Sequence, residues 1–354
     1  MKLIHCGDLH LDSGMESNLA VEKARERNAE ICATFTRMLR YGRDHGVKVL
    51  LIAGDLFDTC RASSQTVQFV LDRIRGAREM DVLYLRGNHD EGDLFEGMAL
   101  PENLKFFGPH WTYYRYGDLV IAGVEPENWE NFYEELKLDP QDTNIVMLHG
   151  QIFTQAGRDM IALPRLRGKA IRYLALGHIH SFQQGSLDLD GQWCYCGCLE
   201  GRGFDELGEK GFVLLDAEQG RVKSEFVPFG SRTLEEVKVD ITGLTTVTQI
   251  LLALERAGSQ IPSSSLVKFT LTGTHTLETQ RDFRFLEKML EPRYYVVKIK
   301  DESSLELARE DYEHDISLKG EFIRMVLASD RPQEEKEQII RWGIQALLGQ
   351  EVEL

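Results

Sequence analysis

The sequence predicts an α/β fold whose core contains two layers of β-sheet. Five short apolar runs rich in β-forming residues lie in the first half of the chain, at residues 3–6, 47–53, 81–85, 144–148 and 173–176. Helix-like spacing separates the first three runs, and alternation of strands and helices is typical of βαβ units around a buried sheet. Residues 111–125, 185–198 and 211–227 have the pattern of hairpins, which favours two packed sheets over a single doubly wound sheet.

The two helices expected between the first three strands are amphipathic. The first, at residues 21–43, places Ile31, Phe35, Met38 and Leu39 on one face. The second, at residues 67–78, repeats apolar residues at the same three- and four-residue spacing. A stripe of this kind covers one face of a sheet.

Composition limits the class of protein. The chain has 354 residues, of which 42% are hydrophobic and 28% charged, as in soluble globular proteins. We find no apolar run of 18 residues and no signal-peptide pattern, so we expect a cytoplasmic protein with no membrane partner and with six reduced cysteines. The net charge of −16 does not favour a protein that binds the nucleic-acid backbone along a basic surface.

Three segments are expected. Residues 1–230 carry the predicted double sheet, and residues 231–300 read as a small α+β unit with strands at 236–241, 266–272 and 294–300. Residues 301–354 hold an acidic linker followed by amphipathic helices at 316–327 and 334–348.

Polar side chains follow all five apolar runs of the first segment. In chain order the motifs are Gly7-Asp8-Leu9-His10, Gly54-Asp55-Leu56-Phe57-Asp58, Gly87-Asn88-His89-Asp90, His149-Gly150 and Gly177-His178-Ile179-His180. The carboxyl ends of parallel strands are where sites form in α/β sheets. Glycine beside these residues allows a sharp turn and a close approach of other groups.

These donors are oxygen and imidazole atoms without thiolates, a set that suits two hard or borderline divalent ions such as manganese. Two like-charged ions also need a bridging carboxylate, and Asp55 is the candidate. Each motif alone is more often a turn or a surface feature. All five together, each after a strand, predict a dinuclear metal site.

This order of motifs resembles the calcineurin-like metallophosphoesterase superfamily over about residues 1–230. The resemblance implies a four-layer α/β/β/α core with a two-metal centre. It implies that Asp8, His10 and His180 bind one ion, that Asn88, His149 and His178 bind the other, and that Asp55 bridges them.

The chemistry implied is hydrolysis of a phosphoester. Two ions lower the pKa of a bridging water and neutralise the phosphate oxygens during in-line attack. His89 follows a ligand and is expected to stabilise the transition state or protonate the leaving oxygen. Asp90 either orients His89 or caps the turn, and the sequence leaves both open.

Two segments narrow the resemblance to SbcD-type DNA repair exonucleases, and more closely to the shorter YhaO-type exonucleases. They are residues 54–59, with Arg61 beyond, and residues 199–212, which contain Gly-Arg-Gly-Phe-Asp-Glu. Thr59-Cys60 stand where protein phosphatases usually carry Arg-Gly, which disfavours a phosphoprotein substrate. Asp58 stands where several recombination nucleases have a second substrate-facing histidine.

The resemblance implies a DNA exonuclease subunit that works in repair with an SMC-like, ABC-type ATPase bound through the C-terminal helices. Packing of these helices on the chain's own α+β unit is the alternative. It also implies a homodimer. Arg61, Arg86 and Arg202 are the candidate phosphate contacts. A small-molecule or cyclic-nucleotide phosphodiesterase and a non-enzymatic scaffold are the competing functions.

Overall fold

A computed structural model describes residues 1–15, 19–58, 62–90, 92, 94–127, 129–155, 157–276, 279–306 and 315–347. It divides into two compact units, Met1–Leu234 and Glu235–Leu354. The division into three segments, with boundaries after residues 230 and 300, stays a prediction. Of the acidic stretch after residue 300, residues 307–314 lie outside the described part.

The first unit contains two six-stranded sheets. The first sheet has the order β14-β13-β1-β2-β3-β4. Its strands are β1 (Lys2–Cys6), β2 (Val49–Ala53), β3 (Asp81–Leu85), β4 (Leu104–Phe106), β13 (Gly211–Glu218) and β14 (Arg221–Pro228). Strands β1 to β4 are parallel, whereas β13 runs antiparallel to β1 and pairs with β14 as the expected hairpin.

The second sheet has the order β11-β12-β10-β7-β6-β5. Its strands are β5 (Thr112–Tyr116), β6 (Leu119–Gly123), β7 (Thr143–His149), β10 (Tyr173–Gly177), β11 (Gln183–Ser186) and β12 (Gln192–Tyr195). Strands β6, β7, β10 and β12 are parallel, and β5 and β11 close the two edges as antiparallel hairpin partners.

The two sheets pack face to face, as the hairpin pattern predicted. One apolar cluster joins Leu51 and Leu83 of the first sheet to Ile145 and Ala175 of the second, all fully buried. Cys194 and Cys196 belong to the same cluster, and Cys198 is buried as well. Cys194 and Cys196 therefore occupy apolar interior positions, as small hydrophobic side chains do, whereas the buried Cys198 lies beside the His180 carbonyl oxygen and the Glu206 carboxylate.

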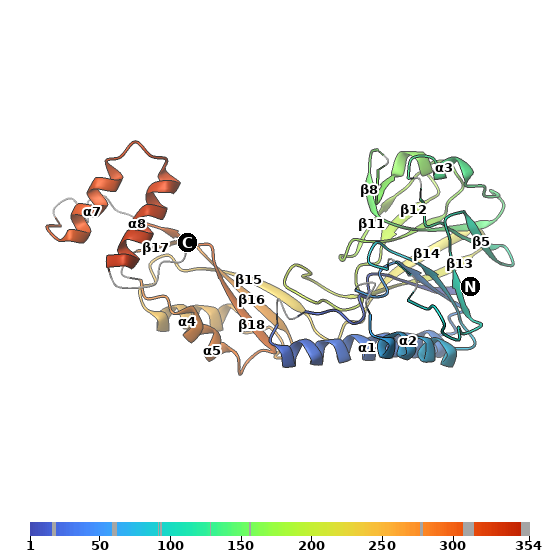
Figure 1. Ribbon diagram of the computed structural model, residues 1–354, viewed down its shortest axis with the longest axis horizontal. Coiled ribbons are helices and arrows are strands. Elements are labelled where there is room, and N and C mark those ends of the chain that lie inside the picture. Colours follow the sequence, from blue (N-terminus) through green and yellow to red (C-terminus); the bar gives the residue numbers. More distant parts are fainter. Residues whose placement is uncertain are drawn as a thin grey trace. The chain divides into compact units, whose positions relative to one another are not determined.

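Helices α1 (Val21–Asp44) and α2 (Ser64–Gly76) form the outer layer on the first sheet (Figure 1). Their buried faces carry Ile31, Phe35, Val70 and Ile74, which match the predicted stripes. The α/β class with two sheets between outer layers is therefore confirmed.

The outer layer on the second sheet is thin. It consists of α3 (Phe132–Glu135), a 3₁₀ turn at Leu163–Leu166, and the strand pair β8 (Gln151–Phe153) and β9 (Met160–Ala162). Phe132 and Tyr133 pack there against Val146 and Leu174 of the sheet. Prolines at positions 126, 140 and 164 interrupt this part of the chain, and proline stops long helices.

The second unit has a three-stranded sheet of the order β15-β16-β18, with strands at Leu234–Asp240, Leu266–Thr272 and Val296–Asp301. Helices α4 (Val247–Ala257) and α5 (Phe283–Leu290) share one core with it. Helices α7 (Leu318–Leu327) and α8 (Gln333–Leu347) pack on each other around Ile323, Val326, Ile340 and Ile344. The short pair β17 (Thr274–His275) and β19 (Ser304–Leu305) completes the unit. No described helix is long and apolar enough to cross a membrane.

Candidate metal centre

Five parallel strands from both sheets end at one place and deliver the predicted polar residues there. In the first sheet, β1 leads to Asp8 and His10, β2 to Asp55 and β3 to Asn88. In the second sheet, β7 ends at His149, and β10 leads to His178 and His180. The residues come together because the carboxyl ends of these strands meet along the interface of the two sheets.

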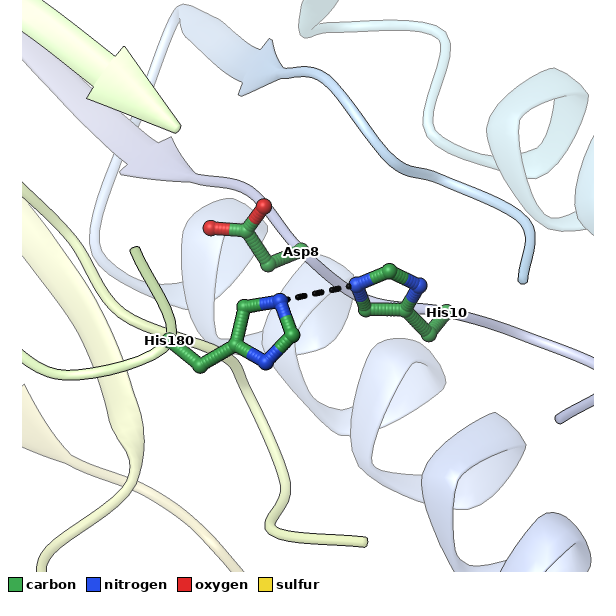
Figure 2. Close-up of side chains that lie close together, drawn as sticks. All are labelled: Asp8, His10 and His180. Carbon is green, nitrogen blue, oxygen red and sulfur yellow. Dashed lines mark hydrogen bonds between the residues drawn. The ribbon is translucent and has the colours of Figure 1, made fainter. Parts of the chain in front are cut away.

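One group of side chains consists of Asp8, His10 and His180. Each offers an atom within 4.8 Å of the others, and Nε2 of His10 lies 3.1 Å from Nε2 of His180 (Figure 2). Two imidazole nitrogens and a carboxylate therefore converge on one point. This donor set fits a divalent ion of hard or borderline character.

A second group consists of Asn88, His149 and His178. Oδ1 of Asn88 lies 2.9 Å from Nε2 of His149 and 3.1 Å from Nδ1 of His178. Nδ1 of His149 donates a hydrogen bond to the Ala53 carbonyl oxygen at 2.9 Å, which directs Nε2 towards the group. These three residues could hold a second ion.

Asp55 lies between the two groups. Its Oδ2 is 3.4 Å from Nε2 of His149 and 3.8 Å from Nε2 of His10. Its Oδ1 accepts a hydrogen bond from the backbone N–H of His89 at 2.9 Å. One carboxylate thus reaches a histidine of each group, which is what a bridging ligand requires.

The backbone is strained at four of these residues. Asp8, His10, Asp55 and His178 have φ angles of 49°, 45°, 49° and 100°, a region that side chains other than glycine rarely adopt. Strain of this kind costs about 1–3 kcal/mol per residue and persists where the surrounding structure holds it. Its concentration here indicates a functional site.

Two glycines make the close packing possible. A Cβ on Gly54 would lie 2.0 Å from Nδ1 of His149, and Gly54 has a φ of 91°. A Cβ on Gly87 would lie 2.2 Å from Oδ1 of Asp55. Any side chain at either position would displace a residue of the site.

The ionisable side chains of the site lie close together and are shielded from solvent. Burial raises the pKa of Asp8 to about 6, although His149 and His180 lower it. Burial opposes ionisation of Asp55 too, but the hydrogen bond and charge of His149 hold its pKa below the usual value. Both carboxylates are only 1% exposed. Because buried carboxylates at close range need positive charge, the site fits cations.

His89 stands beside these donors without joining the two groups described above. Its ring lies edge-on to that of His10, with centroids 5.0 Å apart. Nδ1 of His89 lies 2.8 Å from the carbonyl oxygen of Asp58, which fixes the ring.

Asp90 is buried and bonds to the backbone. Its carboxylate accepts hydrogen bonds from the N–H groups of Leu56, Phe57 and Gly87. These contacts join the loops after β2 and β3, and the choice between orientation of His89 and capping of the turn stays a prediction.

The predicted arginines differ in their surroundings. Arg86 donates its backbone N–H and Nε to the Glu125 carboxylate and is 41% exposed. Arg202 is bound to Asp58 and Glu206. Arg61 lies outside the described residues.

Sequence reasoning assigned no role to the contacts of Asp58 and Glu206. Nδ1 of His10 lies 3.2 Å from Oδ1 of Asp58, and Nδ1 of His180 lies 2.6 Å from Oε1 of Glu206. Both residues stand in motifs that the sequence singles out, but their spacing from the histidines gives no hint of contact.

A cleft of about 540 Å³ opens beside the second group. Asn88 and His149 line it together with Arg86, Glu125, Trp129 and Arg158. Material bound in this cleft would touch the site directly.

Residues 1–182 match the family described as calcineurin-like phosphoesterase. The chain belongs to this family. It is therefore a hydrolase of the metallophosphoesterase class, a family that uses divalent metal ions.

Two relatives show which members of the calcineurin-like phosphoesterase family this chain resembles. It is 28% identical over 298 residues to the uncharacterized metallophosphoesterase YhaO of Bacillus subtilis (strain 168), covering 77% of this chain and 72% of that protein. It is 26% identical over 274 residues to the DNA double-strand break repair protein Mre11 of Methanopyrus kandleri, covering 68% of this chain and 59% of that protein. The resemblance to SbcD- and YhaO-type proteins is therefore confirmed.

Solved structures give weaker likenesses. A dimetal phosphatase from Danio rerio has a TM-score of 0.41 at 10% identity, covering 65% of this chain and 99% of that one. GAP50, the anchor in the inner membrane complex of Plasmodium, has a TM-score of 0.41 at 14% identity, covering 64% and 84%.

Proposed function

We propose that this phosphoesterase is a manganese-dependent DNA exonuclease and the nuclease subunit of a repair complex with an SMC-like ATPase. The observation that carries the proposal is the convergence of seven donor side chains beside the fixed ring of His89. A centre with this composition suits cleavage of a phosphodiester, because it can neutralise phosphate charge and supply a proton to the leaving oxygen.

In the proposed centre, Asp8, His10 and His180 would hold one ion, Asn88, His149 and His178 would hold the other, and Asp55 would be shared between them. When bound, the two ions lower the pKa of a water molecule and neutralise the phosphate oxygens. The donors are oxygens and imidazole nitrogens, with no thiolate among them, which favours manganese over a thiophilic metal.

His89 acts on the substrate in this proposal. Its Nδ1 faces the Asp58 carbonyl oxygen at 2.8 Å, so Nε2 is the nitrogen left for a phosphate or leaving oxygen. Because Nδ1 donates to the carbonyl oxygen, the acid form is the doubly protonated ring, whose Nε2 proton would pass to the leaving 3′ or 5′ oxygen as the phosphodiester bond breaks and leave a neutral imidazole. Arg86, at the edge of the adjoining cleft, is a described candidate for a phosphate contact.

DNA is favoured over a small diester for two reasons. The archaeal relative is described as a double-strand break repair protein. The chain also carries a second unit of its own, with a sheet, two covering helices and the α7–α8 pair. A small-substrate enzyme has no evident use for that unit.

The ATPase partner is proposed to bind α7 and α8. Their inner faces pack on each other, which leaves Leu318 72% and Met325 66% exposed on α7. These two residues are seven positions apart and so lie on one helix face, the spacing that a coiled-coil partner would match. A homodimer of the chain is a further proposal, which light scattering would test.

The test uses end-labelled linear DNA, single- and double-stranded, with manganese, magnesium or chelator. A bis-aryl phosphodiester runs alongside, His89→Ala serves as the inactive variant, and each reaction is repeated with a candidate ATPase and ATP. We expect manganese-dependent shortening from a DNA end, lost with chelator and in the variant. Turnover of the diester with DNA intact under every condition would refute the proposal and favour a small-molecule phosphodiesterase.

A further inference from the structure

The two histidines of the first group, His10 and His180, are arranged in the same way around the group. Their Nε2 atoms face each other at 3.1 Å, and their Nδ1 atoms face away from that point. Nδ1 of His10 lies 3.2 Å from Oδ1 of Asp58. Nδ1 of His180 lies 2.6 Å from Oε1 of Glu206. Glu206 therefore holds the His180 ring from behind through a hydrogen bond, whereas the Asp58 carboxylate lies behind the His10 ring at ion-pair distance without an aligned hydrogen bond.

One arginine joins the two carboxylates. Nη1 of Arg202 donates to Oδ1 of Asp58 at 2.6 Å, and Nη2 donates to Oε1 of Glu206 at 2.8 Å. The backbone N–H of Arg202 also donates to Oε2 of Glu206 at 2.7 Å. The five residues close a ring of contacts that runs His10, Asp58, Arg202, Glu206, His180 and back to His10.

The second group lacks this support among the described contacts. His149 is oriented by the neutral carbonyl oxygen of Ala53, and Nδ1 of His178 faces Asn88 directly. The two halves of the centre are therefore built differently. Among the residues that the structure describes, charged side chains outside the ligand set contact Nδ1 of the histidines in the first half only.

We propose that Arg202 is a positioning residue that clamps Asp58 and Glu206 against His10 and His180, and that it thereby sets the affinity of one of the two metal positions. The inference rests on the proposed two-metal centre. Without the guanidinium, Asp58 and Glu206 would lose their common partner, and both rings would be free to turn away from the ion. Partners behind a ligating histidine typically change metal affinity about 10- to 100-fold.

Bidentate geometry explains why arginine stands here. A guanidinium is planar and presents several N–H groups in a fixed fork, so it can bond two carboxylates at once. Arg202 and Asp58 are mostly shielded from solvent, at 18% and 20% exposure, and Glu206 is buried. In this structure the Arg202 guanidinium contacts Asp58 and Glu206, and a phosphate contact of Arg202 stays a prediction.

The test is metal binding without substrate. Metal-free full-length protein is titrated with Mn²⁺, and free Mn²⁺ is measured by electron paramagnetic resonance. We expect two bound ions per wild-type chain. In Arg202→Met and Glu206→Gln, one position should weaken about 10- to 100-fold while the other keeps its affinity. Asn88→Ala, added to Arg202→Met, should weaken the remaining position.

Arg115→Met is the control, because Arg115 also donates through Nη1 and Nη2 to a carboxylate, that of Asp142, but on an exposed edge of the second sheet. It should bind two ions with wild-type affinity. Melting curves in chelator show whether each variant folds. If Arg202→Met does not fold, the metal affinities of Glu206→Gln and Asp58→Asn test the proposal in its place.

Two ions bound with wild-type affinity in the folded variants would overturn the proposal, as would equal weakening at both positions. A wild-type chain that binds fewer than two ions would overturn the two-metal premise as well. Two ions bound by a wild-type chain that leaves DNA intact would count against the nuclease function only.

Discussion

The carbonyl oxygen of Asp58 lies 2.8 Å from Nδ1 of His89, while the Asp58 carboxylate lies 3.2 Å from Nδ1 of His10. Asp58 thus contacts the ring proposed to act on the substrate through its backbone, and lies at ion-pair distance from a proposed metal ligand through its side chain. This arrangement separates two functions that mutation can test independently.

His89→Ala should lower kcat about 10²- to 10⁴-fold, the usual contribution of a positioned general acid or base. The seven proposed ligands are unchanged, so the variant should still bind two Mn²⁺ per chain. Phosphodiester hydrolysis and a Mn²⁺ titration of the same preparation check both statements. Unchanged hydrolysis would show that His89 has no catalytic part.

Mn²⁺ should stabilise the folded protein, because it balances the buried carboxylates of Asp8 and Asp55. At 100 times the dissociation constant the gain is about 2.7 kcal/mol for one ion that binds only the folded state. Melting temperature against Mn²⁺ concentration measures it. Asp55→Asn should reduce the rise, and a melting temperature that ignores Mn²⁺ in wild-type protein would contradict the centre.

Arg27→Met should destabilise the first unit by about 3–5 kcal/mol, because it leaves the buried Glu200 carboxylate without its cationic partner. Arg27 is fully buried on α1 and donates to Glu200 at 2.9 Å and to the Gly201 carbonyl oxygen at 2.7 Å. Urea unfolding in chelator measures the loss. Arg43→Met on the same helix is the control, since Arg43 is 62% exposed and should contribute little.

His5 should make the protein less stable in mild acid. Burial lowers the pKa of His5 from 6.5 to about 3, so its ring stays neutral in the folded state. Below pH 6.5 the unfolded chain gains a proton at this residue that the folded chain does not. The stability lost should be about 2 kcal/mol at pH 5, with no effect above pH 7.

The His5→Asn variant isolates this effect, because its amide can replace the contact of Nδ1 with the Tyr173 hydroxyl at 2.9 Å. Free energies of unfolding at pH 7.5 and pH 5, both in chelator, should differ less in the variant than in wild type. An equal fall in both proteins would mean that His5 does not titrate as described.

The local spacing of apolar residues was sufficient to predict most of the strands and helices of the first unit. The five apolar runs became β1, β2, β3, β7 and β10, the expected hairpins formed, and α1 and α2 begin and end within three residues of their predicted limits. These features depend on side-chain periodicity within about 25 residues, which is written directly in the sequence. The thin outer layer on the second sheet was not foreseen, because α3 and the 3₁₀ turn are too short to show a period.

The sequence by itself determined which residues gather at the site, because strands of a parallel sheet deliver their carboxyl ends to one edge and each motif directly follows a strand. Only the tertiary structure decided how they are held. Asp58 and Arg202 are 144 residues apart, and Glu206 meets a histidine 26 residues away. Contacts at such separation depend on the packing of two sheets, which no local pattern encodes. The positive φ angles of Asp8, His10, Asp55 and His178 have the same origin, since the surrounding packing imposes them against local preference.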